Sequence, residues 1–195
     1  MKTVLTIAGS DSIGGAGIQA DLKTIEAHKI YGMSAITCVT AQNTLGVLGI
    51  TELDPEFVAL QIRAVFEDIR PDAVKIGMVG SADIAAAIAD TLEKYEAKNI
   101  VVDPVMVAST GAVLMADDAV DVIVNRLLPL ATVVTPNTHG TGCTLSSAIA
   151  CGLARDYDVQ ASIAQAKAYL TGALEKDPQL GKGVGPLNHI WNLHR

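Results

Sequence analysis

Short apolar runs alternate along the chain with longer segments in which apolar residues recur every three or four positions. The short runs are rich in Val and Ile, which is typical of strands buried on both faces. The longer segments have the spacing of amphipathic helices that cover a sheet. The pattern predicts strands at 3–8, 34–41, 46–53, 74–78, 99–103 and 131–135, and helices at about 17–30, 55–70, 81–95, 116–128, 142–154 and 159–174.

This alternation predicts an α/β fold, with a mostly parallel central sheet covered by helices on both faces. In such sheets, ligands bind beyond the carboxyl ends of the strands. Glycine or polar residues follow five of the predicted strands, and we therefore expect them to share one small-molecule site. They are residues 9–17, Gln42, Met78, 103–106 and 140–143.

The segment 140–143 carries the most chemistry. Gly140 and Gly142 flank Thr141, so backbone N–H groups can converge there without side-chain obstruction. The first N–H groups of the following helix have no partners within it, and an anion such as phosphate binds at such a place. The same field favours the thiolate of Cys143, and phosphoryl transfer to an alcohol requires a proton acceptor beside the phosphoryl group. The alternative is that the glycines only shape the start of a helix.

Four other polar residues each have a functional and a structural interpretation. Asp21 adjoins the site or is a solvated helix carboxylate, and solvation is the more common case. The amide of Gln42 can pair with a ring nitrogen and its neighbouring amino group, or satisfy loop backbone. Asp103 can hold Mg²⁺ through water, or cap its loop. Lys75 is unusual within an apolar strand, where it is expected to snorkel or pair with a carboxylate.

The first glycine-rich loop is a weaker signal. Its glycines stand at 9, 14, 15 and 17, which is not the spacing of a nucleotide-binding loop. We expect this loop only to bring backbone close to a ligand.

Composition narrows the class of protein. The 195 residues suit a single domain, and a net charge of −7 with only 14 Lys and Arg argues against a nucleic-acid surface. No apolar run approaches the roughly 18 residues of a membrane span, and the first residues do not form a signal peptide. Three cysteines without metal-ligand spacing suggest reduced thiols in a cytoplasm. We therefore expect a cytoplasmic, small-molecule protein.

Several motifs together resemble one known family. They occur in chain order at 8–11 (AGSD), 14–24 (GGAGIQADLKT), 41–44 (AQNT), 75–78 (KIGM), 103–106 (DPVM) and 137–144 (NTHGTGCT). The chain resembles the hydroxymethylpyrimidine and phosphomethylpyrimidine kinases of thiamine biosynthesis, which belong to the ribokinase-like superfamily. The resemblance extends over essentially the whole chain, residues 1–195.

The resemblance implies ATP-dependent phosphorylation of 4-amino-5-hydroxymethyl-2-methylpyrimidine and of its monophosphate. It implies ATP and Mg²⁺ as cofactors, a homodimer, and a three-layer ribokinase-like fold. A pyridoxal-type vitamin kinase is the alternative enzyme. The implied pyrimidine pocket comprises Gly9, Ala16, Asp21, Gln42, Met78 and Val105; Gly140, Thr141 and Gly142 form the anion hole, Cys143 takes the position of the superfamily's aspartate base, and Asp103 is the candidate metal ligand.

One departure from the family pattern concerns residues 135–140. In the family, Thr-Pro-Asn continues into Asn-x-x-Glu and a long segment before the second glycine motif, whereas here Asn137 leads directly into Thr138. Gly140 stands where the glutamate is expected. The chain thus lacks an internal segment near 137–138, roughly two βαβ units of about 30 residues each, which includes much of the ATP-binding wall.

Three interpretations of this departure remain open. The protein has the segment and the printed chain passes over it; or a real deletion folds around a shortened sheet; or the kinase is degenerate. Intact flanking motifs favour the first, because excising strands would expose sheet edges. If the deletion is real, a pyrimidine-binding module without catalysis is the non-enzyme alternative.

Overall fold

The fold is built on one six-stranded sheet with the strand order β3-β2-β1-β4-β5-β6. The structure, a computed structural model, describes residues 1–105, 117–135 and 141–192. Every neighbouring pair of strands is parallel except β2 and β3, which are antiparallel. The strands are β1 (Thr3–Asp11), β2 (Tyr31–Asn43), β3 (Gly46–Glu52), β4 (Ala73–Ile76), β5 (Ile100–Val102) and β6 (Val133–Val134). The carboxyl ends of the five parallel strands therefore share one edge.

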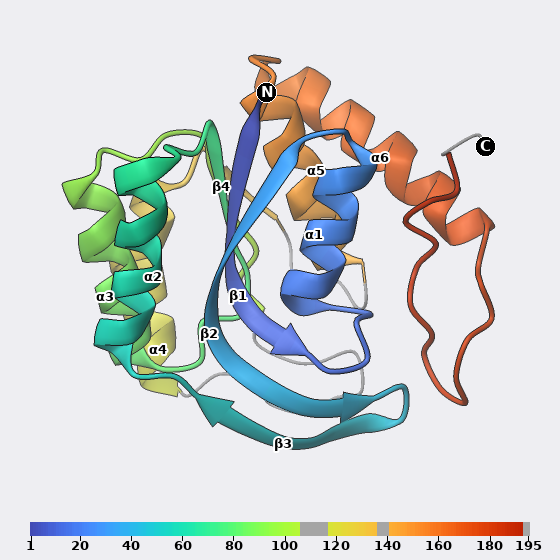
Figure 1. Ribbon diagram of the computed structural model, residues 1–195, viewed down its shortest axis with the longest axis horizontal. Helices are drawn as coiled ribbons and strands as arrows, with labels where there is room; N and C mark the ends of the chain where they lie inside the picture. Colours follow the sequence, from blue (N-terminus) through green and yellow to red (C-terminus); the bar gives the residue numbers. More distant parts are fainter. Residues whose placement is uncertain (106–116, 136–140, 193–195) are drawn as a thin grey trace.

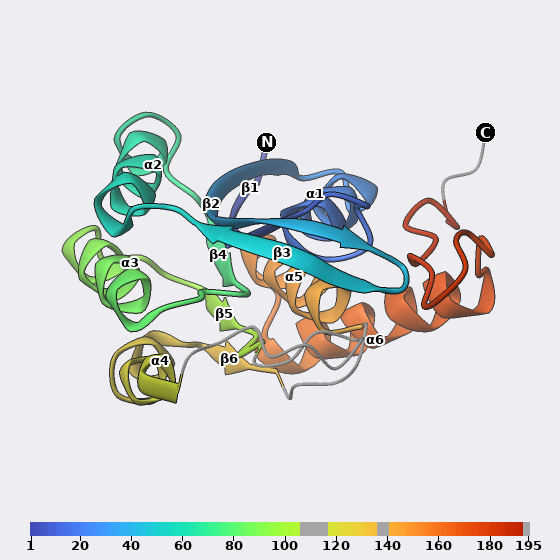
Figure 2. The same cartoon turned by 90° about the horizontal axis from the view of Figure 1, so that it is seen from below.

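Helices cover both faces of the sheet (Figures 1 and 2). One layer contains α1 (Gly17–Ala27), α5 (Gly142–Ala154) and α6 (Val159–Glu175), and the other contains α2 (Pro55–Asp68), α3 (Ala82–Lys94) and α4 (Asp117–Val122). Successive residues of β1 point to opposite faces. Val4 therefore packs in the core under α1 and α5, whereas Leu5 and Ile7 pack in the core under α2 and α3. The predicted three-layer α/β fold is confirmed.

Local structure differs from the expectation at several element ends. The first helix ends at Ala27 rather than near 30, because Lys29 takes a left-handed conformation with a φ of 55°. The helix expected at 116–128 is α4, followed by a π-helical turn at Ile123–Leu127 and a 3₁₀ turn at Leu128–Leu130. The expected strand at 131–135 shortens to the two residues of β6.

The helix starts follow the chemistry of their capping residues. Asp54 caps α2 as expected, because its carboxylate accepts hydrogen bonds from the N–H groups of Glu56 and Phe57. Ser81 occupies the N-cap position of α3, but its hydroxyl makes no capping hydrogen bond. Among the described residues, no helix is both long and apolar enough to cross a membrane.

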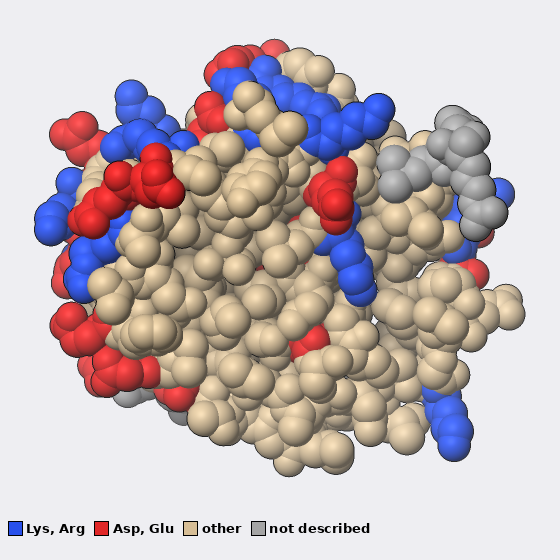
Figure 3. All heavy atoms as spheres, in the orientation of Figure 1, with Lys and Arg blue, Asp and Glu red and all other residues tan. Residues whose placement is uncertain are grey.

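The β2–β3 hairpin projects beyond the helical layers along the lower side of the molecule in Figure 1. Its exposed side chains include Val39, Leu45, Leu48 and Ile50. Figure 3 shows a broad lower area almost without Lys, Arg, Asp or Glu over this part of the molecule. The hairpin therefore presents an apolar rather than a charged surface.

A C-terminal strap, defined as residues 181–186, runs back to the hairpin tip. The hydroxyl of Thr44 accepts hydrogen bonds from the N–H groups of Lys182 (3.1 Å) and Gly183 (3.2 Å). The carbonyl of Thr44 accepts a third from Val184 at 3.2 Å. A side chain on Gly183 would collide with that carbonyl, so the strap lies directly on the turn.

Candidate active site

The start of α5 meets the ends of β1 and β5 at the carboxyl edge of the sheet. Asp103 follows β5, and a Cβ added to Gly142 would lie 2.8 Å from its Oδ2 atom. Gly17, at the start of α1, has a φ of 55°, and a side chain there would collide with the carbonyl of Gly9. Glycine is therefore required at 17 and 142 because two loops and a carboxylate approach their backbones closely.

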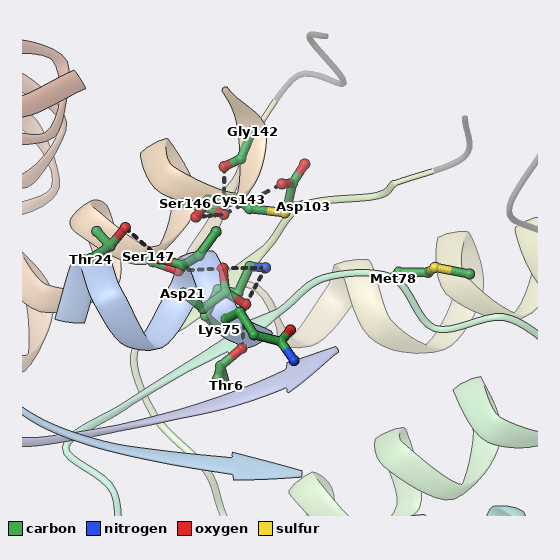
Figure 4. Close-up of polar contacts among 12 residues, drawn as sticks. Thr6, Asp21, Thr24, Lys75, Met78, Asp103, Gly142, Cys143, Ser146 and Ser147 are labelled. Atoms are coloured by element: carbon green, nitrogen blue, oxygen red, sulfur yellow. Dashed lines mark hydrogen bonds and ion pairs between the residues drawn. The ribbon is translucent and has the colours of Figure 1, made fainter. Parts of the chain in front are cut away.

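A buried ion pair lies beneath this edge (Figure 4). The ammonium of Lys75 in β4 donates to both carboxylate oxygens of Asp21 in α1, at 3.0 and 2.8 Å. The same carboxylate accepts from the hydroxyl of Thr6 in β1 at 2.6 Å and from that of Ser147 in α5 at 2.8 Å. These four residues, called the Asp21 network below, connect two strands and two helices.

The Asp21 network corrects one expectation and answers another. A solvated carboxylate was the favoured interpretation of Asp21, but its side chain is 0% exposed, as is that of Lys75. Lys75 pairs with a carboxylate rather than snorkelling. Burial on its own would lower the pKa of Lys75, but the carboxylate of Asp21, helped by Cys143 and Asp103, raises it above its ordinary value. Both groups are therefore charged at neutral pH.

Asp103 is the second buried carboxylate of the site. Its side chain accepts a hydrogen bond of 3.4 Å from the hydroxyl of Ser146, which also donates to the carbonyl of Gly142 at 2.7 Å. Burial raises the pKa of Asp103; Lys75 opposes this rise and Asp21 adds to it. Among the described residues, no cluster of three or more His, Cys, Asp or Glu could hold a metal ion. A single carboxylate fits Mg²⁺ held mainly by water and substrate phosphates.

The thiol of Cys143 differs from the expectation. The field at the start of α5 was expected to favour the thiolate, but the pKa of Cys143 is raised to about 11. Burial is the main cause; Lys75 lowers the pKa, whereas Asp21 and Asp103 raise it. Two nearby carboxylates and a poorly hydrated site thus outweigh the helix dipole, and the thiol is protonated at neutral pH.

The first glycine-rich loop holds an anion of its own. One oxygen of the Asp11 carboxylate accepts hydrogen bonds from the N–H groups of Gly15 (2.9 Å) and Ala16 (2.8 Å), and the other accepts from Ile13 at 3.0 Å. Asp11 is 4% exposed. The donors at the start of α1 are therefore satisfied within the chain, which agrees with the absence of nucleotide-loop spacing.

The expected pyrimidine-pocket residues lie in two groups. Gly9 and Met78 are neighbours, since a Cβ on Gly9 would lie 3.4 Å from the Met78 sulfur and 2.7 Å from that of buried Cys38. Met78 lies well apart from the polar cluster in Figure 4. Backbone of Gln42 is clipped to the first loop by two hydrogen bonds of 2.8 Å with the Ser12 hydroxyl.

The remaining expected residues are placed less fully. Ala16 and Val105 are partly buried beside Asp11 and Asp103, to which their N–H groups donate. Thr141 and Gly142 stand at the start of α5. Gly140 and the proposed junction at 137–138 lie outside the described residues. The roles of all these residues in binding or catalysis stay predictions.

The sequence was next compared with known proteins. The family model described as Phosphomethylpyrimidine kinase matches residues 11–138 and 137–188. The chain belongs to the phosphomethylpyrimidine kinase family. The hydroxymethylpyrimidine/phosphomethylpyrimidine kinase of Streptomyces coelicolor is 40% identical over 256 positions, covering 97% of this chain and 95% of that protein. The bifunctional thiamine biosynthesis protein ThiED of Geobacter sulfurreducens is 41% identical, and the match covers 96% of this chain but only 52% of that protein.

Solved structures of this family and of a related one share the fold. The phosphomethylpyrimidine kinase of Clostridium difficile superposes with a TM-score of 0.82 and 38% identity, covering 89% of this chain and 100% of that one. An ADP complex of Bacillus subtilis pyridoxal kinase gives a TM-score of 0.86 and 28% identity, covering 97% and 98% of the two chains. The ribokinase-like resemblance is thus confirmed at the level of family and fold.

The same comparisons bear on the interior of the chain. The Streptomyces alignment runs over 256 positions, while 97% of 195 residues is about 189, so about 67 positions hold no residue of this chain. The two matches of the family model meet at 137–138.

Sequence reasoning missed how the site is supported. Lys75 received no role, and Thr6, Asp11, Ser146 and Ser147 were not singled out. A signal for the ion pair was present, because Asp21 stands three residues after Ile18 and four before Ile25, both of which are buried. A carboxylate on a buried helical stripe and a lysine in a buried strand predict one another.

Proposed function

We propose that this chain phosphorylates a hydroxymethylpyrimidine and its monophosphate, with ATP as the phosphoryl donor. The observation that carries this proposal is the convergence of Gly142, Cys143 and Asp103 at the carboxyl edge of the sheet, in a chain of the phosphomethylpyrimidine kinase family. A helix start is a site for the negative charge of a phosphoryl group, and most of the catalysis of phosphoryl transfer comes from positioning and electrostatics.

The protein groups divide the work as follows. Backbone N–H groups in the first turn of α5 hold the negative charge that develops on the transferred group. Cys143, protonated in the resting site, accepts the proton of the substrate hydroxyl only as that hydroxyl becomes acidic during transfer. Gly9, Ala16, Gln42, Met78 and Val105 bind the pyrimidine, with the Gln42 amide facing its ring nitrogen and amino group.

ATP and Mg²⁺ are the proposed cofactors. The carboxylate of Asp103, buried beside Gly142, is the group that would hold Mg²⁺ among the described residues. The metal and nucleotide would supply the phosphoryl group and neutralise its charge. We also propose a cytoplasmic homodimer.

A second candidate function is a pyrimidine-binding module that transfers no phosphate. The specific observation that favours it is the set of about 67 aligned positions without a residue of this chain, out of 256 with 97% of the 195 residues matched, combined with family matches that meet at 137–138. Loss of an ATP-binding wall would leave the pocket at β1, β2 and β4 in place. A pyridoxal-type vitamin kinase is a further candidate, since pyridoxal kinases superpose with a TM-score of 0.86.

Binding and turnover measured on the same preparation separate these functions. Calorimetric titration with hydroxymethylpyrimidine, with pyridoxal and with Mg-ATP would accompany a phosphoryl-transfer assay. Pyrimidine binding with turnover that Cys143→Ala reduces at least about a hundredfold supports the kinase. Pyrimidine binding that survives in Cys143→Ala, with turnover in neither protein, supports the binding module. Preferential turnover of pyridoxal supports the vitamin kinase.

A further inference from the structure

The most unusual feature outside the reacting groups is the charge buried in the Asp21 network. Lys75 and Asp21 are both 0% exposed, and charges are rarely buried without a compensating role. A buried ion pair adds little net stability, because desolvation of both charges offsets their attraction. A well-packed apolar pair could fill the same space. Stability alone therefore gives no reason for this lysine.

The contacts of Asp21 lead from Lys75 to the start of α5. One oxygen of Asp21 accepts from Lys75 at 3.0 Å and from Ser147 at 2.8 Å. Ser147 lies four residues after Cys143, one helical turn along the same face. Asp21 itself lies one turn after Gly17, whose N–H hydrogen-bonds to the Cys143 sulfur. Lys75 and Cys143 are thus linked through α1 on one side and α5 on the other (Figure 4).

We propose that Lys75 is a positioning residue, which holds the Asp21 carboxylate against Ser147 and thereby fixes the first turn of α5 at the phosphoryl-transfer site. The assignment rests on the proposed function for its catalytic meaning. Its structural content is independent of turnover. Without the ammonium, the carboxylate is buried and unpaired, so it moves toward water or takes up a proton, and its contact with Ser147 weakens.

Backbone hydrogen exchange tests this local role. The quantity to measure is the protection of amides 145–147 relative to amides 151–153 at the far end of α5. In Ser147→Ala and in Lys75→Met we expect this ratio to fall about tenfold, because only the first turn loses its tether. The double variant Lys75→Met/Ser147→Ala should fall no further than the lower single variant, because both substitutions act through Asp21.

Two further variants separate positioning from general destabilisation. In Asp21→Asn/Lys75→Met the pair is neutral, and the amide oxygen still accepts from Ser147, so the parent ratio should return. Lys2→Met removes a partly exposed lysine that pairs with Asp72 at 3.2 Å, and it should leave the ratio unchanged.

Faster exchange at both ends of α5 in equal proportion in Lys75→Met would show a merely structural lysine and overturn the proposal. Should Lys75→Met fail to fold, Ser147→Ala decides, and a parent-like ratio in it overturns the proposal. If the parent chain transfers no phosphate, the proposed kinase fails while the exchange comparison still stands.

Discussion

The carboxylate of Asp103 lies against the α-carbon of Gly142, where a Cβ would come within 2.8 Å of Oδ2. This contact joins the loop after β5 to the first residue of α5. It explains why the second glycine of the motif cannot be replaced without moving a charged group. It also suggests how to perturb the site while leaving the fold intact.

Gly142→Ala should therefore reduce phosphoryl transfer by about a hundredfold or more, because displacement of reacting groups by about 1 Å has effects of that size. Pyrimidine affinity should stay within about threefold of the parent. Steady-state kinetics and calorimetry give the two quantities. The matched control is Gly152→Ala on the same helix, where a Cβ would lie 2.6 Å from the Ser162 hydroxyl. It should lower the melting temperature and leave the kinetics of folded protein unchanged; the reverse pattern would contradict the prediction.

The Lys75–Asp21 pair predicts an alkaline loss of stability. The pKa of Lys75 is higher in the folded chain than its ordinary value of about 10.4, so the folded state holds this proton more tightly. The resulting stabilisation is complete below that pH and declines as the pH rises above it toward the folded-state pKa. Urea unfolding between pH 8 and about 11.5 measures it.

Other groups with raised pKa values contribute to the same alkaline loss, so the neutral variant is the reference. Asp21→Asn/Lys75→Met should lose less free energy of unfolding over this pH range than the parent. Parallel curves for the two proteins would show that the pair carries no pH-dependent stability. Asp21→Asn alone leaves the ammonium buried without its partner and should cost about 3–5 kcal/mol at neutral pH.

Cys143 should react slowly with iodoacetamide at pH 7, because burial raises its pKa to about 11 and the thiolate is the nucleophile. Its alkylation rate should increase about tenfold per pH unit from pH 7 to about 10. Peptide mass spectrometry distinguishes it from Cys151, whose pKa is raised by burial to about 12. A rate that reaches its plateau below pH 8 would restore the thiolate that the sequence suggested.

The C-terminal strap should depend on one hydroxyl. Thr44→Val keeps the shape of the side chain and removes the acceptor for the N–H groups of Lys182 and Gly183. Each lost hydrogen bond contributes about 1 kcal/mol, so trypsin should cleave after Lys182 at least about tenfold faster. Thr51→Val, on the exposed part of β3, is the control. Equal cleavage rates in both variants would mean that the strap is held by other contacts.

Much of this architecture could be predicted from hydrophobic periodicity because it depends on local pattern. The alternation of strands and helices, the cap at Asp54 and the shared edge of the five strands all followed from residues close together in the chain. The shortening of β6 and the π-helical turn after α4 did not, since they depend on how distant segments pack.

The chemistry of the site was harder to predict than its position. The thiolate of Cys143 was expected from the helix dipole alone, but the pKa of this thiol depends on burial and on Asp21 and Asp103, which come from other elements. The pairing of Asp21 with Lys75 spans 54 residues, and it becomes predictable only when both are recognised as charges at buried positions.

The self-contained loop formed by Asp11 has a consequence for ligand selection. Two helices, α1 and α5, begin at the same edge of the sheet, and either start could attract an anion. The carboxylate of Asp11 already occupies the donors of Ile13, Gly15 and Ala16, and so acts as a permanent internal occupant of the α1 start. The chain thereby directs a phosphate toward α5 by competition within its own sequence.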